Sequence, residues 1–145
     1  VHGGTYLAPE PAVMEWWQYL LPYQSNIRKA LHCPSDPIVK QNPALESYLW
    51  NGMFSFGKRL ARVNNPSLKI VVSERADQGD AITHQGYPAF RDLAVWEGLL
   101  KKDRHNGGSN YLFVDGHVEW KKFPDTIGDG GLNDSNMHYV SGFMQ

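Results

Sequence analysis

Cysteine, clusters of positive charge and long apolar runs are what this sequence lacks. Cys33 is the only cysteine among the 145 residues, so no disulfide can close within the chain. The formal net charge is −1 and no run of lysine or arginine occurs, which leaves a nucleic-acid or acidic-membrane partner without electrostatic support. No apolar stretch reaches membrane-spanning length, and no signal peptide is recognisable. These absences leave open both the cytosol and the cell envelope, where a partner cysteine could lie in another segment or protein.

The composition indicates one domain with a substantial core. Hydrophobic residues make up 41% of the chain, and the five tryptophans predict a core that relies on large rings, some of which could be exposed at a contact surface. No internal repeat or domain boundary is visible, so residues 1–145 are expected to form a single domain. Because the chain starts at Val1 and enters a Gly-rich loop at once, we expect a trimmed part of a longer protein.

Apolar spacing predicts short helices near the N-terminus. Residues 13–21 (VMEWWQYLL) place apolar side chains at helical intervals, and Pro22 then stops or kinks the helix. Residues 24–31 add a second short turn with three side chains inward: Ile27, Ala30 and Leu31.

Further along, strand signals dominate. Residues 46–57 (ESYLWNGMFSFG) indicate either a hairpin turning at Asn51-Gly52 or a strand followed by a short element. Residues 68–74 (LKIVVSE) are the clearest buried strand, because three β-branched residues follow one another. The polar stretch 75–92 is predicted to be a long loop, either mobile or used in binding. Residues 93–102 could form a helix or a strand. Together these elements predict an α+β fold with an antiparallel sheet.

A β-hairpin is predicted over residues 110–123. Asp115-Gly116 is a two-residue turn signal, and Gly116 is expected at positive φ. The resulting cross-strand pairs are Val114–His117, Phe113–Val118, Leu112–Glu119 and Tyr111–Trp120. The second and fourth pairs would share an apolar face, and the other two would form a mixed, partly wet face.

His105 and Asp115, with nine residues between them, invite a metal or acid–base interpretation. A strand rises about 3.3 Å per residue, so His105 would lie roughly 20 Å from the hairpin tip unless Gly107-Gly108 folds the chain back. The turn accounts for Asp115, and a structural histidine that bonds a nearby carbonyl or carboxylate is favoured for His105. A phosphate loop at Gly107-Gly108 is excluded, because no Walker lysine is present and no helix is expected to follow.

Cys33 lies beside His32 and close to Asp36, where it could be a nucleophile or part of a metal cluster. No second cysteine exists for a zinc site of the usual type. A buried or disulfide-linked structural cysteine is therefore favoured.

The loop 125–136 is rich in groups that could donate oxygen atoms to calcium: Asp125, Asp129, Asn133 and Asp134. Their spacing does not match an EF-hand. A solvated, turn-rich loop is favoured, and no other cofactor is indicated.

The segment RHNGGSNYLFVDGHVEW resembles the C-terminal signature of pilin-like proteins with the prepilin-type processing-associated domain, named for its motif H-X9-DG. The usual form of that signature is close to RH-x-GG-x-N-x-LF-x-DGHV, and the matching residues are Arg104, His105, Gly107, Gly108, Asn110, Leu112, Phe113, Asp115, Gly116, His117 and Val118. Earlier segments follow in the family's order: WWQYLLPY (16–23), HCPSDP (32–37), SYLWNG (47–52) and RVNNPSLKIVV (62–72). The resemblance covers most of the chain.

The resemblance implies a type IV pilin-like or type II secretion pseudopilin-like protein, a non-enzymatic structural subunit. Such proteins carry a cleavage and methylation signal and a long hydrophobic helix, both absent from this chain. That helix would sit in the inner membrane and later pack with other pilin-like subunits in a fibre, while this chain would form the α+β head at the periplasmic or extracellular side of the cell envelope. Secretion pseudopilins often hold calcium in a C-terminal loop, here 125–136, and Cys33 could pair with a cysteine near the helix.

Two other classes of function stay open. An extracytoplasmic binding head would engage polysaccharide or an exported protein through exposed Trp and Tyr side chains and the 75–92 loop. A metal-dependent hydrolase would use His105, His117 and Asp115, and would require histidines among His84, His105 and His117 to converge around an open coordination position.

Overall fold

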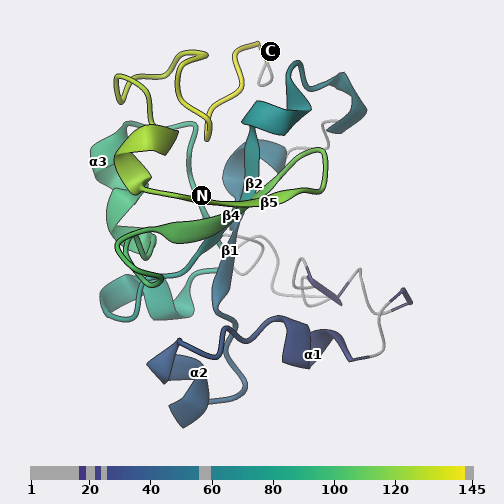
Figure 1. Cartoon of the computed structure of the whole chain (residues 1–145), viewed down its shortest axis with the longest axis vertical. Helices are drawn as coiled ribbons and strands as arrows, with labels where there is room; N and C mark the ends of the chain where they lie inside the picture. The colour runs from purple at the N-terminus through teal and green to yellow at the C-terminus, as the bar shows by residue number, and fades with distance from the viewer. Residues whose placement is uncertain (1–16, 19–21, 24–25, 56–59, 143–145) are drawn as a thin grey trace, which may run out of the picture.

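The computed structural model describes residues 17–18, 22–23, 26–55 and 60–142. Its centre is a five-stranded mixed sheet in the order β3-β1-β2-β4-β5, flanked by short helices (Figure 1). The strands are β1 (Tyr48–Asn51), β2 (Ile70–Glu74), β3 (Gly86–Tyr87), β4 (Ser109–Phe113) and β5 (Val118–Lys121). The α-helices are α1 (Ile27–Ala30), α2 (Pro37–Gln41) and α3 (Leu93–Trp96). The α+β class expected from the sequence is confirmed.

The sheet is mostly, but not entirely, antiparallel. β1 pairs with β2, β2 with β4 and β4 with β5 in antiparallel fashion, whereas β1 and β3 are parallel. β3 and a 3-10 helix at Gly79–Thr83 both lie within the stretch predicted to be a loop at 75–92. The loop prediction is therefore wrong for these residues, because two residues are enough to extend the sheet beside β1.

β2 is buried over its whole length, as expected for the central strand of a sheet covered on both faces. It begins after a 3-10 helix at Pro66–Leu68, and the residue before that helix, Asn65, adopts a left-handed conformation with φ of 56°. The strand predicted at 68–74 is confirmed for residues 70–74, whereas Leu68 ends the 3-10 helix. Its β-branched residues suit a strand that contacts side chains above and below.

The predicted hairpin exists, but its register is wrong by one residue. Leu112 pairs with Val118 and Tyr111 with Glu119, and the loop holds three residues rather than two. Gly116 has a φ of +94°, as expected, and completes the loop in a left-handed conformation. A slip of one residue moves a whole strand's side chains to the opposite face. Consequently Val118 and Trp120 do not join the face of Tyr111 and Phe113.

The loop of the hairpin docks on the start of β2, which explains the register. The backbone N–H of Val114 donates to the carbonyl of Lys69 over 2.9 Å, and the N–H of Asp115 donates to the carbonyl of Pro66. These bonds fix where β4 ends. β4 also turns Tyr111 and Phe113 toward Ile70 in a small buried cluster.

The observed helices can be compared with those predicted from the sequence. Residues 93–102 begin as a helix, α3, which continues into a 3-10 helix at Glu97–Leu99. α1 confirms the short turn after residue 24 with Ile27 and Leu31 buried, but Ala30 is exposed, because the single helical turn directs it to solvent. The predicted helix at 13–21 lies outside the described residues except for Trp17 and Gln18. Among the described helices, none has the length and hydropathy needed to cross a membrane.

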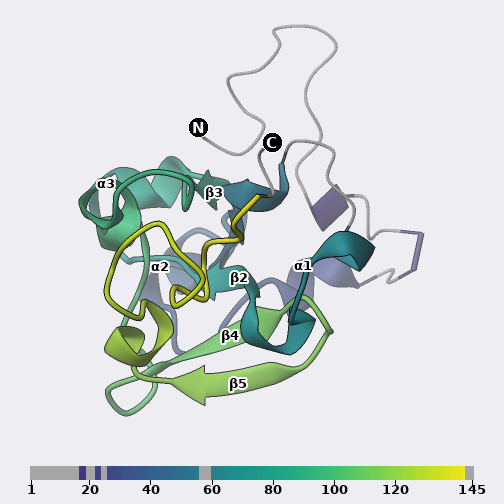
Figure 2. The ribbon, with the colours of Figure 1, turned by 90° about the horizontal axis from the view of Figure 1, so that it is seen from above.

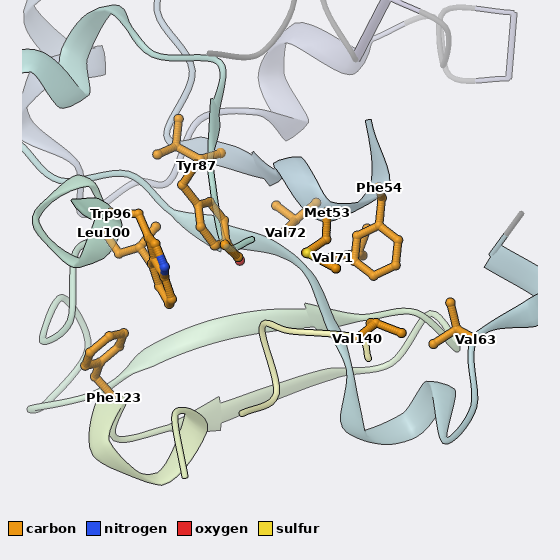
Figure 3. Packing of buried hydrophobic residues seen from close by; sticks show 12 residues of the cluster. Met53, Phe54, Val63, Val71, Val72, Tyr87, Trp96, Leu100, Phe123 and Val140 are labelled. Carbon is orange, nitrogen blue, oxygen red and sulfur yellow. The ribbon is translucent and has the colours of Figure 1, made fainter. Parts of the chain in front are cut away.

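The main core lies between the sheet and the segments that contain α3 and the C-terminal residues. Figure 2 shows α3 and the C-terminal segment on the same side of β4 and β5. Trp96 of α3 is fully buried against Tyr87 and Phe123, with ring centroids 5.3 and 6.4 Å away (Figure 3). Large rings thus fill the core, as the composition predicts.

Asn51-Gly52 does not make a hairpin turn; β1 runs directly into a 3-10 helix at Gly52–Phe54. The Asn51 side chain is buried and donates to the carbonyls of Ile70 and His138 over 2.9 and 2.8 Å. A Cβ on Gly52 would meet the carbonyl oxygen of Tyr87 at 2.9 Å. The pair therefore serves close packing between segments rather than chain reversal.

Candidate functional site

Three side chains capable of chemistry meet at one end of the sheet. The Cys33 thiol comes from the loop after α1, Glu74 from the last position of β2, and His105 from the segment before β4. His105 Nε2 lies 3.7 Å from Cys33 Sγ and 3.0 Å from Glu74 Oε1. Cys33 and Glu74 are buried, and the His105 side chain is 26% exposed. The site is thus a buried pair of donors with a histidine at its surface.

The backbone around Cys33 is held by short hydrogen bonds. The Cys33 N–H donates to Ser47 Oγ over 2.9 Å, and the Asp36 N–H donates back to the Cys33 carbonyl. Asp36 then caps α2 by accepting a bond from the Ile38 N–H. Ser-Asp-Pro thus acts as a helix N-cap followed by proline in the first turn, which is a common way to begin a helix. This arrangement fixes the position of the thiol.

A tight turn holds His105. Its N–H and carbonyl both bond to Gly108, and the two residues between them have positive φ, 55° at Asn106 and 82° at Gly107. Two consecutive positive φ values define a type I′ turn. The indole N–H of Trp120 also donates to the His105 carbonyl over 2.6 Å, and the indole ring lies against Gly108. Asn106 and Gly107 therefore reverse the chain between His105 and Gly108.

Glu74 is the centre of the site. Its Oε2 accepts a hydrogen bond from the Asn110 N–H over 2.8 Å, while Oε1 faces the imidazole of His105. Arg104 Nε lies 3.4 Å from Oε1, but without the geometry of a hydrogen bond. The carboxylate is therefore held by the Asn110 N–H and the His105 ring, with a cation beside it.

Two buried arginines surround this centre. Arg75 pairs with Asp36 at 3.0 Å and also donates to the carbonyls of Glu46 and Ala76. Arg104 pairs with Asp77 at 2.6 Å and donates to the Arg75 carbonyl. Breaking a buried pair of this kind costs about 3–5 kcal/mol, because the remaining charge stays buried. These buried ion pairs and hydrogen bonds thus link three segments of the chain: the loop at 32–37, the end of β2 and the segment before β4.

Burial shifts the pKa of three side chains in and around the site: Cys33, Tyr48 and Arg75. Desolvation raises the pKa of the Cys33 thiol, so the thiol is protonated at neutral pH. Desolvation also raises the pKa of nearby Tyr48 to about 12. Arg75 has its pKa lowered by burial but keeps its charge beside Asp36.

The geometry does not make a nucleophile–base–acid relay. In such a relay the base uses one ring nitrogen for the nucleophile and the other for the orienting acid. Here Cys33 and Glu74 both face the same nitrogen, Nε2 of His105. The arrangement is instead a set of three different donor atoms around one space. Among the described residues, it is the single group of three or more His, Cys, Asp and Glu side chains whose ligand atoms lie within 4.8 Å of one another.

The structure does not bring His105 and Asp115 together. His105 lies before the start of β4, and Asp115 lies in the loop after its end, where its Oδ1 accepts hydrogen bonds from the backbone and ring of His117. The side-chain bond to His117 lowers the pKa of Asp115 and raises that of His117. The interval of nine residues therefore corresponds to the 105–108 turn, the five residues of β4 and the start of the loop.

The predicted calcium ligands do not lie together around one position. The carboxylate of Asp129 accepts bonds from the Asn133 amide and the Gly131 N–H, whereas Asp134 accepts a bond from the Ser141 hydroxyl. Asp125 lies in a 3-10 helix at Phe123–Thr126. These contacts lower the pKa of Asp129 and Asp134. Calcium binding by Asp125, Asp129, Asn133 and Asp134 stays a prediction.

Sequence reasoning placed Cys33 with His32 and Asp36 and missed Glu74. The true neighbours of Cys33 lie 41 and 72 positions along the chain, at Glu74 and His105. One signal was available, because an acidic and a basic residue, Glu74 and Arg75, follow directly on the apolar residues and Ser73 of a buried strand. Charges at the end of a buried strand require partners. His105 does contact a carboxylate, that of Glu74, and its purely structural role stays a prediction.

A second buried polar centre, around His138, was also missed. His138 Nδ1 accepts from the Tyr87 hydroxyl at 2.9 Å, and its Nε2 lies 3.0 Å from the Thr126 hydroxyl, which itself donates to the Phe123 carbonyl. The Nε2–H tautomer satisfies all of these bonds. Burial lowers the pKa of His138 to about 3, with a smaller contribution from Lys69. This histidine is thus a neutral core residue.

No family model, curated protein or solved structure matches this chain.

Proposed function

We propose that this chain is the head domain of a pilin-like protein, a non-enzymatic structural subunit of a type IV pilin-like fibre or a type II secretion pseudopilus. One observation carries the proposal: the segments that resemble the family's separate motifs meet in space. HCPSDP supplies Cys33 and Asp36, SYLWNG supplies Ser47, and the H-X9-DG segment supplies Arg104 and His105. His105 and Arg104 contact Glu74, two residues beyond the fourth segment, 62–72, and Cys33 belongs to the same cluster.

At the other end of β4, two further segments that resemble family motifs also contact each other. The Asp-Gly loop of the motif binds the Asn-Pro-Ser segment through the bond from the Asp115 N–H to the Pro66 carbonyl. The motif therefore attaches both ends of one strand to the rest of the head. Arg104, His105 and the backbone of Asp115 all make contacts that hold segments of the fold together, which supports a structural subunit more than an enzyme.

In the full-length protein, a hydrophobic helix would precede this head and hold it at the inner membrane. The head would then lie in the periplasm or outside the cell. Other subunits of the same kind would be its partners through that helix.

The proposal is tested by the encoded residues that precede Val1 and by the location of the full-length protein. We expect a leader with a cleavage site, followed by roughly 20 apolar residues. Cell fractionation should place the full-length protein in the inner membrane, and cross-linking in intact cells should give a ladder of multiples. A cytosolic domain before Val1, or a soluble protein without such a ladder, would contradict the proposal.

A binding head is the second candidate, and it rests on exposed apolar side chains of β5. Val118 is 63% exposed and Trp120 is 44% exposed. Trp96, by contrast, is fully buried, and no coplanar row of exposed tryptophans is present among the described residues. Binding of polysaccharide through Trp120 would be lost in Trp120→Ala and kept in Glu119→Ala, measured by co-sedimentation with the insoluble polymer.

The hydrolase alternative has no geometric support in the described part of the chain. His105 and His117 lie at opposite ends of β4, and His117 bonds to Asp115 and Glu119 at the hairpin loop. A shared metal would require these side chains to converge.

A further inference from the structure

We propose that Cys33, Glu74 and His105 bind a single Zn²⁺ ion, which ties three separate segments of the head together. The ligands are a thiol, a carboxylate and an imidazole, which are the three protein groups that zinc binds most often. This proposal is independent of whether the protein assembles into a fibre.

Two of the three separations between the donor atoms match those around a tetrahedral zinc ion, and the third, between Cys33 Sγ and the Glu74 carboxylate, is within 4.8 Å. With bonds of about 2.3 Å to sulfur and about 2.0 Å to nitrogen and oxygen, the sulfur and nitrogen ligands lie about 3.5 Å apart, and nitrogen and oxygen about 3.3 Å apart. The observed distances are 3.7 Å from Cys33 Sγ to His105 Nε2 and 3.0 Å from that nitrogen to Glu74 Oε1. Ion binding thus requires only small side-chain adjustments.

The site offers one imidazole nitrogen to two acceptors, a thiol sulfur and a carboxylate oxygen. A single N–H can donate well to only one of them, whereas a metal ion on the Nε2 lone pair contacts both. Burial keeps the Cys33 thiol protonated. On binding zinc, the thiol releases its proton to solvent, and the neutral imidazole carries its hydrogen on Nδ1.

The surrounding groups hold the ligands in place, as second-shell partners do in metal sites. The Asn110 N–H orients the carboxylate of Glu74, the Ser47 hydroxyl holds the backbone of Cys33, and the turn at 105–108 holds His105. The ligands come from elements whose positions the fold fixes without the ion.

Arg104 is the cation that most directly opposes an ion, since its Nε lies 3.4 Å from Glu74 Oε1. Its guanidinium makes its shorter contact with Asp77, at 2.6 Å, and Arg75 pairs with Asp36. The negative charge of Glu74 is therefore the least compensated in the network, and it faces the thiol and the imidazole.

The exposure of the site and the number of its ligands are also compatible with a bound zinc ion. The His105 side chain is 26% exposed, so an ion can enter from its side, while Cys33 and Glu74 are shielded behind it. Three protein ligands leave a fourth position, which water would fill.

The test uses the 145-residue chain freed of metal with a chelator and then titrated with Co²⁺ and Zn²⁺. We expect one ion per chain, a thiolate-to-cobalt charge-transfer absorption, and displacement of cobalt by zinc. Cys33→Ser and His105→Gln should weaken zinc binding at least about 100-fold, more than loss of a second-shell partner. The matched control is His117→Gln, at an exposed histidine outside the site, which should bind zinc within about twofold of the unaltered chain.

Two results would overturn the proposal. One is the absence of zinc binding with a Kd below ~1 mM in the unaltered chain. The other is unchanged binding by a Cys33→Ser variant that circular dichroism shows to be folded. If that variant does not fold, the unaltered chain decides the matter, because bound zinc should slow alkylation of Cys33 by a thiol reagent. An unchanged alkylation rate with saturating zinc would refute the assignment.

Discussion

The buried imidazole of His138 should make the stability of this domain fall as the pH drops below about 6. In the folded chain His138 is fully buried between Tyr87 and Thr126, and its pKa is lowered to about 3. In the unfolded chain its pKa returns to about 6.5. Between these values the unfolded state binds one more proton than the folded state, so the free energy of unfolding decreases as pH falls.

The magnitude follows from the two pKa values. The free energy of unfolding changes by about 1.4 kcal/mol per pH unit over this range. From pH 7 to pH 5, His138 alone should remove about 2 kcal/mol, and the result hardly depends on the folded pKa as long as it lies below 5. That loss is a large part of the stability of a small domain.

The assay is urea unfolding followed by tryptophan fluorescence at pH 7, 6 and 5, on the unaltered chain and on His138→Gln. Glutamine can hydrogen-bond to Tyr87 and Thr126 but does not titrate. Both proteins contain the same carboxylates and other histidines. The difference between their free energies of unfolding as a function of pH therefore reports the titration of His138 alone. If both proteins lose the same free energy between pH 7 and pH 5, His138 is not held neutral by burial and the reasoning is wrong.

Three further predictions concern stability at neutral pH. Gly108→Ala places a Cβ 2.5 Å from the ring of Trp120 and should cost about 1–3 kcal/mol, whereas Gly98→Ala, with open space around it, should be nearly neutral in the same urea titration. Gly116→Val should lower the melting temperature, since φ is +94° there and a β-branched residue disfavours it by about 1–3 kcal/mol; an unchanged value would contradict the loop assignment. Lys69→Met removes a buried ammonium that donates to three carbonyls of residues 134–139, so hydrogen exchange of those amides should accelerate and that of β2 should not.

Local chemistry is what the sequence could predict. Three β-branched residues in succession predict β2, Asp115-Gly116 predicts a reversal with Gly116 at positive φ, and both features are present. The interval between His105 and Asp115 also has a local basis, because a turn and a five-residue strand fill it. These features depend on backbone preferences of neighbouring residues, which are readable within a short window.

The register of the hairpin could not be derived from the turn signal. A two-residue loop would pair Phe113 with Val118, but the N–H groups of Val114 and Asp115 bond instead to the carbonyls of Lys69 and Pro66. The loop therefore holds one more residue and bonds to the segment just before β2. These tertiary hydrogen bonds outweigh the local preference, because they pair two backbone donors of the loop.

The sequence by itself determined the fold class, the central strand, the existence of the hairpin and the structural role of the glycine at its loop. The tertiary structure alone decided the register, the parallel strand β3 and the partners of the reactive side chains. Cys33, Glu74 and His105 meet although 41 and 31 residues separate them along the chain. Such a meeting depends on how the strands pair and on which charges are buried together, and these are long-range properties that no neighbouring residue encodes.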